Sequence, residues 1–133
     1  MAEKSDEARR QKILHYRILE QQMAQLQQQL QLLEQNIAEV TNTLAAIDDL
    51  KNSKPGSQML APISSGIFVK AELKDTDSFI VNVGANVTVE KSSEDVKKIL
   101  ESQSKEITEM RDEMMKGMEQ LALQMNSLES ELS

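Results

Sequence analysis

The side chains that most often catalyse reactions or bind metals are few in this chain of 133 residues. It has no cysteine, which excludes thiol chemistry, disulfides and cysteine-based metal sites. The single histidine, His15, has no second histidine with which to share a metal, so we interpret it as a surface residue. Asp75 and Asp77 lie in a predicted turn, where aspartate binds nearby backbone groups. We therefore expect no catalytic residue, no cofactor, no metal and no enzymatic activity.

Composition argues against two classes of partner. The net charge of −7 disfavours nucleic acid, because phosphate binding needs a basic surface. A small basic cluster at Arg9, Arg10, Lys12 and Arg17 is offset by nearby acids, so a nucleic-acid clamp is the weaker alternative. No run approaches the roughly 20 apolar residues that span a bilayer, and the first residues lack the apolar core of a secretory signal. We expect a cytoplasmic protein that does not bind membranes.

The chemistry that the chain does offer is hydrophobic contact at helical spacing. In the N-terminal half, apolar residues follow one another at strictly alternating steps of three and four. They are Tyr16, Leu19, Met23, Leu26, Leu30, Leu33, Ile37, Val40, Leu44 and Ile47. A second stripe, with one polar member, consists of Val96, Leu100, Gln103, Ile107, Met110, Met114, Met118, Leu121, Met125, Leu128 and Leu132. This period keeps one side of a helix against a partner helix, as in a coiled coil.

The two stripes match if the chain folds back on itself. Facing residues then have numbers that add up to 144, except at three pairs, where the sum is smaller by one. This single register predicts an antiparallel coiled coil within one chain; pairing of each helix with another chain is the alternative. The steps through Met110, Met114 and Met118 form an eleven-residue unit, which would locally relax the supercoil. Together with Gly117, it predicts a looser packing there.

Between the helices, four short runs alternate in the manner of β-strands. They cover residues 58–61, 67–73, 79–83 and 87–90, and turn-forming residues separate them into two β-hairpins. The first helix should end ahead of Pro55 and Gly56, and the second should begin near Ser92 or Ser93. We expect one structural domain with three parts: an N-terminal coiled-coil helix (1–53), a double β-hairpin (54–92) and a C-terminal coiled-coil helix (93–133). The fold class is α+β, a long antiparallel α-helical coiled coil joined by two β-hairpins.

The hairpins predict an oligomer. Two isolated hairpins are marginally stable in water, and no further helix is available to cover their apolar faces and open edges. We therefore expect the strands to pair with strands of other chains. The predicted oligomerisation residues are Leu60, Ile67, Val69, Leu73, Phe79, Val81, Val83, Val87 and Val89.

This order of helix, two hairpins and helix resembles a prefoldin subunit of the α type, and the absence of added tails resembles the archaeal form. The most specific matches are M-L-A-P at 59–62, I-F-V at 67–69, L-K-D-T-D at 73–77 and V-N-V-G-A-N-V-T-V-E-K at 81–91. The resemblance covers nearly the whole chain, and two hairpins rather than one indicate the α type.

The resemblance implies a hexamer of two α-type and four β-type prefoldin subunits, whose hairpins form an oligomeric β-barrel platform. It further implies an ATP-independent molecular chaperone, a holdase. Such a complex captures unfolded polypeptides at the coiled-coil tips and delivers them to a cytosolic group II chaperonin. The alternative function is a coiled-coil scaffold or tether with one fixed partner and no client.

A holdase needs exposed apolar groups that do not select one partner. In the predicted register, residues 1–10 have no facing partner, so the start of the first helix should overhang and fray. Leu14, Ile18 and Leu123 lie off the stripes near that end and should face outward. The methionines of the second helix add side chains that repack readily around varied partners. The predicted client-binding tip comprises Ile13, Leu14, Ile18, Leu123, Leu128 and Leu132.

Overall fold

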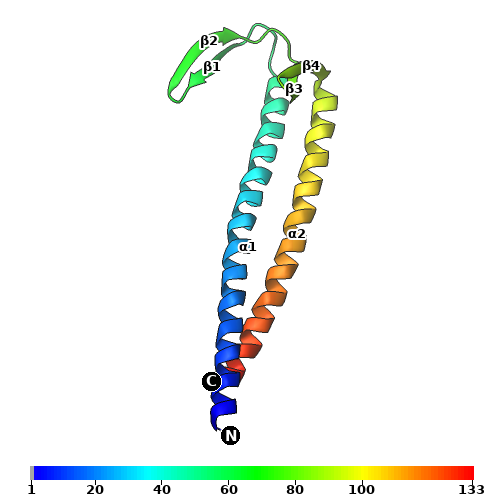
Figure 1. Ribbon diagram of the computed structural model, residues 1–133. Coiled ribbons are helices and arrows are strands. Elements are labelled where there is room, and N and C mark those ends of the chain that lie inside the picture. Colours follow the sequence, from blue (N-terminus) through cyan, green and yellow to red (C-terminus); the bar gives the residue numbers. More distant parts are fainter. Residues whose placement is uncertain (1) are drawn as a thin grey trace. The chain divides into compact units, whose positions relative to one another are not determined.

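The computed structural model describes residues 2–133 and contains two long helices with two β-hairpins between them in the chain (Figure 1). The elements are α1 (Ala2–Lys51), β1 (Gln58–Ser64), β2 (Ile67–Glu72), β3 (Ser78–Gly84), β4 (Val87–Ser92) and α2 (Ser93–Leu132). The chain divides into a terminal unit, Met1–Ile37 with Glu106–Ser133, and a central unit, Ala38–Lys105. This order of elements confirms the predicted α+β fold.

The buried side of α1 is the stripe that the sequence predicts. Between Tyr16 and Ile47, the ten stripe residues are buried or half-buried, and every other residue of this stretch is exposed. Leu19 and Ile47 are each only 4% exposed. Burying a side chain of this size contributes about 1.5–3 kcal/mol, so the stripe supplies much of what stabilises the helix pair.

On α2 the structure corrects the predicted stripe at two positions. Gln103 and Met110 are exposed, and the next residues, Ser104 and Arg111, are half-buried in their place. With this correction the seam steps alternate regularly between four and three, so the predicted eleven-residue unit is wrong. Val96 is half-buried as predicted, and from Leu100 onward the seam of α2 consists of Leu100, Ser104, Ile107, Arg111, Met114, Met118, Leu121, Met125, Leu128 and Leu132. The directions of side chains around a helix are fixed relative to one another. A single apolar side chain beside the seam therefore cannot turn into the seam unless the whole helix rotates.

The correction also brings the layers into one register. Ser104 and Arg111 lie at the same offset from Val40 and Leu33 as the other facing pairs, so the slip of one residue disappears at these layers. Two ion pairs support the register, one in each unit. In the terminal unit, Lys12 Nζ lies 3.3 Å from Glu131 Oε2, one residue from its expected partner. In the central unit, Lys97 of α2 pairs with Asp48 of α1, again one residue away.

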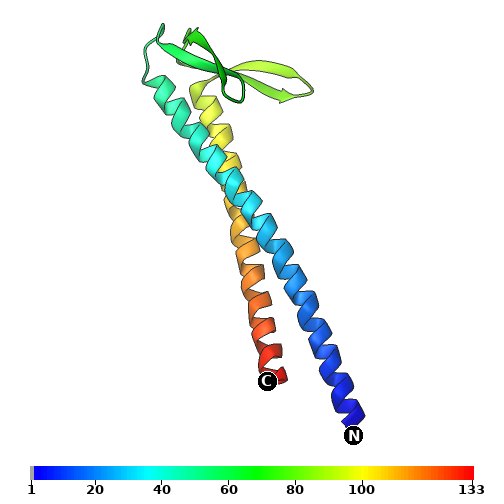
Figure 2. The same cartoon turned by 90° about the vertical axis from the view of Figure 1, so that its left-hand side faces the viewer.

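The four strands form two separate antiparallel hairpins, β1–β2 and β3–β4 (Figure 2). Both connections are two-residue turns, closed by the pairs Ser64–Ile67 and Gly84–Val87. Each hairpin has a register shift just before its turn. The strands begin within one residue of the predicted positions, and three of the four extend further than predicted. No third strand pairs with either hairpin in the part of the chain that the structure describes.

The junction between β4 and α2 is held by serine hydroxyls, as the sequence suggested. Ser92 Oγ accepts a hydrogen bond of 3.2 Å from the backbone N–H of Asp95, which caps the first turn of α2. Ser93 is fully buried, and its hydroxyl donates to Asp77 Oδ1 at 2.8 Å. Asp75 Oδ1 in turn accepts a bond of 2.9 Å from the backbone N–H of Asp77, which confirms that this acid shapes the turn.

Candidate functional site

The predicted tip residues of the terminal unit fall into two groups. Leu14, Ile18 and Leu123 are exposed by 58%, 52% and 64%, and they face away from the seam. The other three predicted tip residues are half-buried, and they are Ile13, Leu128 and Leu132. Because Leu14 and Ile18 are four residues apart on α1, they are neighbours on one face of the helix. The structure therefore places a pair of exposed apolar side chains near the start of α1.

The start of α1 runs beyond the end of α2. The ion pair of Lys12 with Glu131 places the last turn of α2 beside Lys12, and residues 5–11 of α1 are all exposed. The predicted overhang is therefore present, and it is helical from Ala2 onward. Met1 lies outside the described residues, and the fraying of this helix start stays a prediction.

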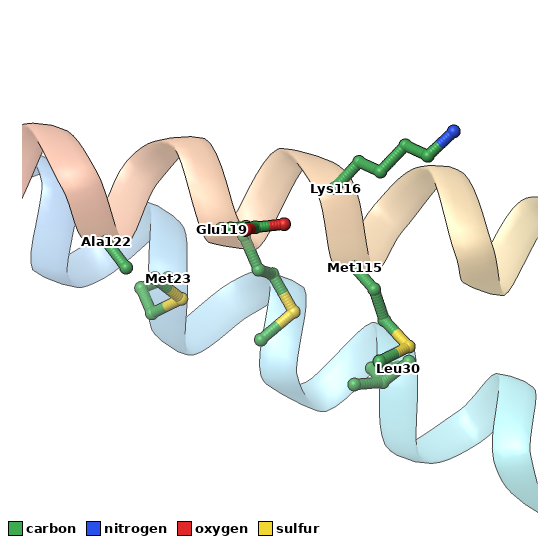
Figure 3. A pocket seen from close by; sticks show the side chains of 7 residues that line it. Met23, Leu30, Met115, Lys116, Glu119 and Ala122 are labelled. Atoms are coloured by element: carbon green, nitrogen blue, oxygen red, sulfur yellow. The ribbon is translucent and has the colours of Figure 1, made fainter.

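An apolar groove runs along the seam of the terminal unit (Figure 3). It has a volume of about 450 Å³ and is lined mainly by Met23 and Leu30 of α1 and by Met115, Met118 and Ala122 of α2. Met115 and Leu30 line the same groove, whereas Lys116 points away from it in Figure 3. Methionine is unbranched and polarisable, so such a surface can adapt to differently shaped partners. The spacing of Met115 in the sequence already placed this residue outside the stripe, but the sequence did not indicate the groove.

The hairpins of the central unit carry a second exposed apolar surface. Of the predicted oligomerisation residues, five are exposed, namely Leu60, Ile67, Val69, Val83 and Val87. The half-buried ones are Leu73, Phe79, Val81 and Val89. Exposed apolar clusters of this kind usually mark an interaction site.

Sequence reasoning missed several members of this surface. Ile80 is 70% exposed, Ile63 is 64% exposed and Phe68 is 54% exposed. In the first hairpin, Phe68 pairs with Pro62 and Val69 pairs with Ala61, so the two pairs point to opposite faces. Both faces of this hairpin are therefore apolar. The signal lay in the run from Ile67 to Val69, which does not alternate between apolar and polar residues.

Other kinds of site find no support in the described part of the chain. Residues 2–133 contain no group of three or more histidine, cysteine or acidic side chains placed to hold a metal ion. Neither described helix is long and apolar enough to cross a membrane.

Comparison with known proteins identifies the family. The prefoldin subunit family model matches residues 19–133. A prefoldin subunit alpha of Thermofilum pendens is 28% identical over 117 residues, which are 88% of this chain and 91% of that protein. One of Methanosarcina acetivorans is 30% identical over 135 residues, covering 98% and 94%.

The structural comparison agrees with the family match. The cryo-EM structure of filamentous PFD from Methanocaldococcus jannaschii has a TM-score of 0.75 at 25% identity, covering 87% of this chain and 96% of that chain. Since these matches extend through both helices and both hairpins, the chain belongs to the prefoldin family of chaperone subunits, as a member of its alpha type.

Proposed function

We propose that this chain is a subunit of an ATP-independent holdase that captures unfolded polypeptides at its coiled-coil tips. The observation that carries the proposal is the exposure of Leu14, Ile18 and Leu123 in the terminal unit. Large apolar side chains that face water on a helix lower solubility. They can also bind any polypeptide that exposes apolar residues. Weak contacts of this kind gain avidity when several arms of one complex act together.

The same proposal assigns the hairpins to assembly. We propose that they join those of other prefoldin subunits, two α-type with four β-type, in a β-barrel platform. Supporting this, Leu60, Phe68 and Ile80 are exposed in the single chain, and each sheet has only two strands with open edges. The three predicted parts then have separate roles: 1–53 and 93–133 form the arm, and 54–92 is the assembly region.

We further propose that the complex works in the cytoplasm and passes its clients to a group II chaperonin. The exposed apolar side chains of the arm support holding a client until another machine accepts it.

The test is a triple substitution at the tip in the assembled complex. Leu14→Ser, Ile18→Ser and Leu123→Ser remove three exposed apolar side chains without touching the seam. We expect the variant complex to assemble normally and to need several-fold more protein to suppress aggregation of a chemically denatured client. Light scattering during dilution of the client measures this.

A matched control separates tip contacts from general loss of apolar surface. Leu32 and Ile99 are also exposed helix residues, by 61% and 38%, but they lie outside the predicted tip. Changing both to serine should leave suppression at the wild-type level. Equal suppression by the tip variant and wild type would refute client capture at these residues and favour the scaffold alternative.

A further inference from the structure

Three glutamates stand together on α2 in the terminal unit. Glu106, Glu109 and Glu113 are exposed and follow one another at helical spacings of three and four residues. In the described part of the chain, no ion pair includes any of them, and the nearby Arg111 has its Nη2 3.5 Å from Asp112 Oδ1 instead. Like charges at this spacing repel one another and weaken a helix slightly. The arrangement therefore adds nothing to the stability of α2, and it leaves three negative charges free for a partner.

An open groove adjoins these charges. The three glutamates line a hollow of about 310 Å³ together with Met110, which is 54% exposed. Met110 and Glu113 also line a second hollow of about 350 Å³, whose other lining residues are uncharged, namely Leu26 of α1 and Met114 and Gly117 of α2. Because the two hollows share residues, they form one continuous groove with an apolar end and a negatively charged end. We call it the acidic groove.

The acidic groove and the groove beside Met115 lie on opposite flanks of the seam. Met110 is one residue before a seam residue and Met115 is one residue after one, so the two methionines point to different sides of α2. The lining of the groove beside Met115 contains one cation and one anion, Lys116 and Glu119. The lining of the acidic groove contains three anions and, among the described residues, no cation. The two flanks thus present similar apolar side chains but different charge.

The facing helix does not neutralise this charge. Between Glu20 and Glu34, α1 has no charged residue, and most of its exposed residues there are glutamines. Leu26, which α1 contributes to the acidic groove, lies in the middle of this uncharged stretch. The negative charge of the groove therefore comes from α2 alone. A surface that combines apolar contact area with one sign of charge favours partners of the opposite charge.

We propose that the acidic groove binds segments of non-native polypeptides in which lysine or arginine flanks apolar residues. The apolar side chains of the segment occupy the end lined by Leu26 and Met114, and its cations lie against the glutamates. The complex then holds basic clients more tightly than acidic clients of equal apolar content. This inference rests on the proposed holdase function and adds to it a preference for one class of client.

Two fluorescent peptides with the same apolar residues test this preference in the assembled complex. One peptide carries three lysines beside its apolar residues, and the other carries three glutamates. Exposed ion pairs are individually weak, so we expect fluorescence anisotropy to show about tenfold tighter binding of the lysine peptide, with a preference that shrinks as salt is added. Equal binding of the two peptides would overturn the proposal alone. Binding of neither peptide would refute the holdase function on which it rests.

Substitutions in this chain test whether the acidic groove is the source of the preference. Glu106→Gln, Glu109→Gln and Glu113→Gln together should lower the preference for lysine by at least about threefold. The matched control has Glu101→Gln, Glu119→Gln and Glu129→Gln, which remove the same charge from exposed sites outside the groove and should leave the preference unchanged. An equal loss in both variants would assign the preference to the net charge of the complex and overturn the site.

Met110→Ser tests the apolar part of the groove. This variant removes an exposed apolar side chain and leaves the charges, so both peptides should bind a few-fold more weakly while the preference for lysine remains. Unchanged binding of both peptides would place the contact elsewhere and overturn the proposal. Loss of the complex in the triple glutamine variant, seen by native mass spectrometry, would assign the groove to a partner subunit and would also overturn it.

Discussion

Ser93 is fully buried where β4 meets α2, and two of its polar groups bind Asp77. Its backbone N–H donates to the Asp77 carbonyl oxygen at 3.0 Å, and its hydroxyl donates to Asp77 Oδ1 at 2.8 Å. These bonds tie the turn before the second hairpin to the first residue of the second helix. Ser93 thus helps to fix the start of the second helix relative to the second hairpin.

Removal of this hydroxyl should weaken the junction. In Ser93→Ala the carboxylate of Asp77 loses a hydrogen bond, but it is exposed, so water can take the place of the serine. We expect a loss of about 1 kcal/mol and a melting temperature for the assembled complex a few degrees lower. Thermal unfolding measures the change. Ser102→Ala, at an exposed site within α2, is the control, and equal melting of the two variants would show that the buried hydroxyl contributes nothing.

At the scale of the elements, the turn of the second hairpin carries local strain. Ala85 and Asn86 both have positive φ, at 49° and 61°, and they form the two-residue connection between β3 and β4. Positive φ at both central residues is the type I′ turn, whose twist suits a hairpin. Asparagine tolerates this conformation better than alanine, because its short polar side chain can bind local backbone groups.

Substitutions at Ala85 should therefore shift stability in opposite directions. Ala85→Asn should stabilise the assembled complex by about 0.5–1 kcal/mol, and Ala85→Val should destabilise it by about 1–2 kcal/mol, since a β-branched residue is poorly accommodated at positive φ. Chemical denaturation of the two complexes side by side measures the difference. Variants of equal stability would mean that the turn relaxes to a different type.

At the scale of the whole molecule, the single chain leaves its hairpins uncovered. Leu60 lies on one face of the first hairpin and Val69 on the other, and both are exposed. Sheets of two strands with apolar faces gain most of their stability from further strands or a covering layer. We therefore expect the folded state of this region to depend on partner chains more than that of the coiled coil does.

A charge placed on this surface should block assembly. Leu60→Lys puts an ammonium where a partner strand would pack, and burying it unpaired would cost several kcal/mol. We expect native mass spectrometry with β-type subunits to show loss of the proposed complex of two copies of this chain and four of its partner. Leu32→Lys is a close control, because both leucines are 61% exposed and Leu32 lies on α1. An intact complex for both variants would contradict assembly through this face.

Most of the architecture could be predicted from the sequence, because it depends on interactions between residues that are close together in the chain. The stripe of α1 was predicted residue for residue, because a strict alternation of three and four defines one helix face. Both hairpins and the serine cap of α2 followed from turn and capping chemistry that acts within a few residues. The exposure of Leu14, Ile18 and Leu123 was predictable for the same reason, whereas their contact with clients and the assembly role of the hairpins stay predictions.

Tertiary structure alone decided which residues of α2 complete the seam. The prediction chose Met110 for its hydrophobicity and Gln103 for its spacing, yet Arg111 and Ser104 are the half-buried residues, because packing against an existing stripe rotates the whole helix into one register. The groove beside Met115 likewise emerged only in three dimensions. Whether a strand face or a seam edge is covered depends on elements distant in sequence, which no local pattern records.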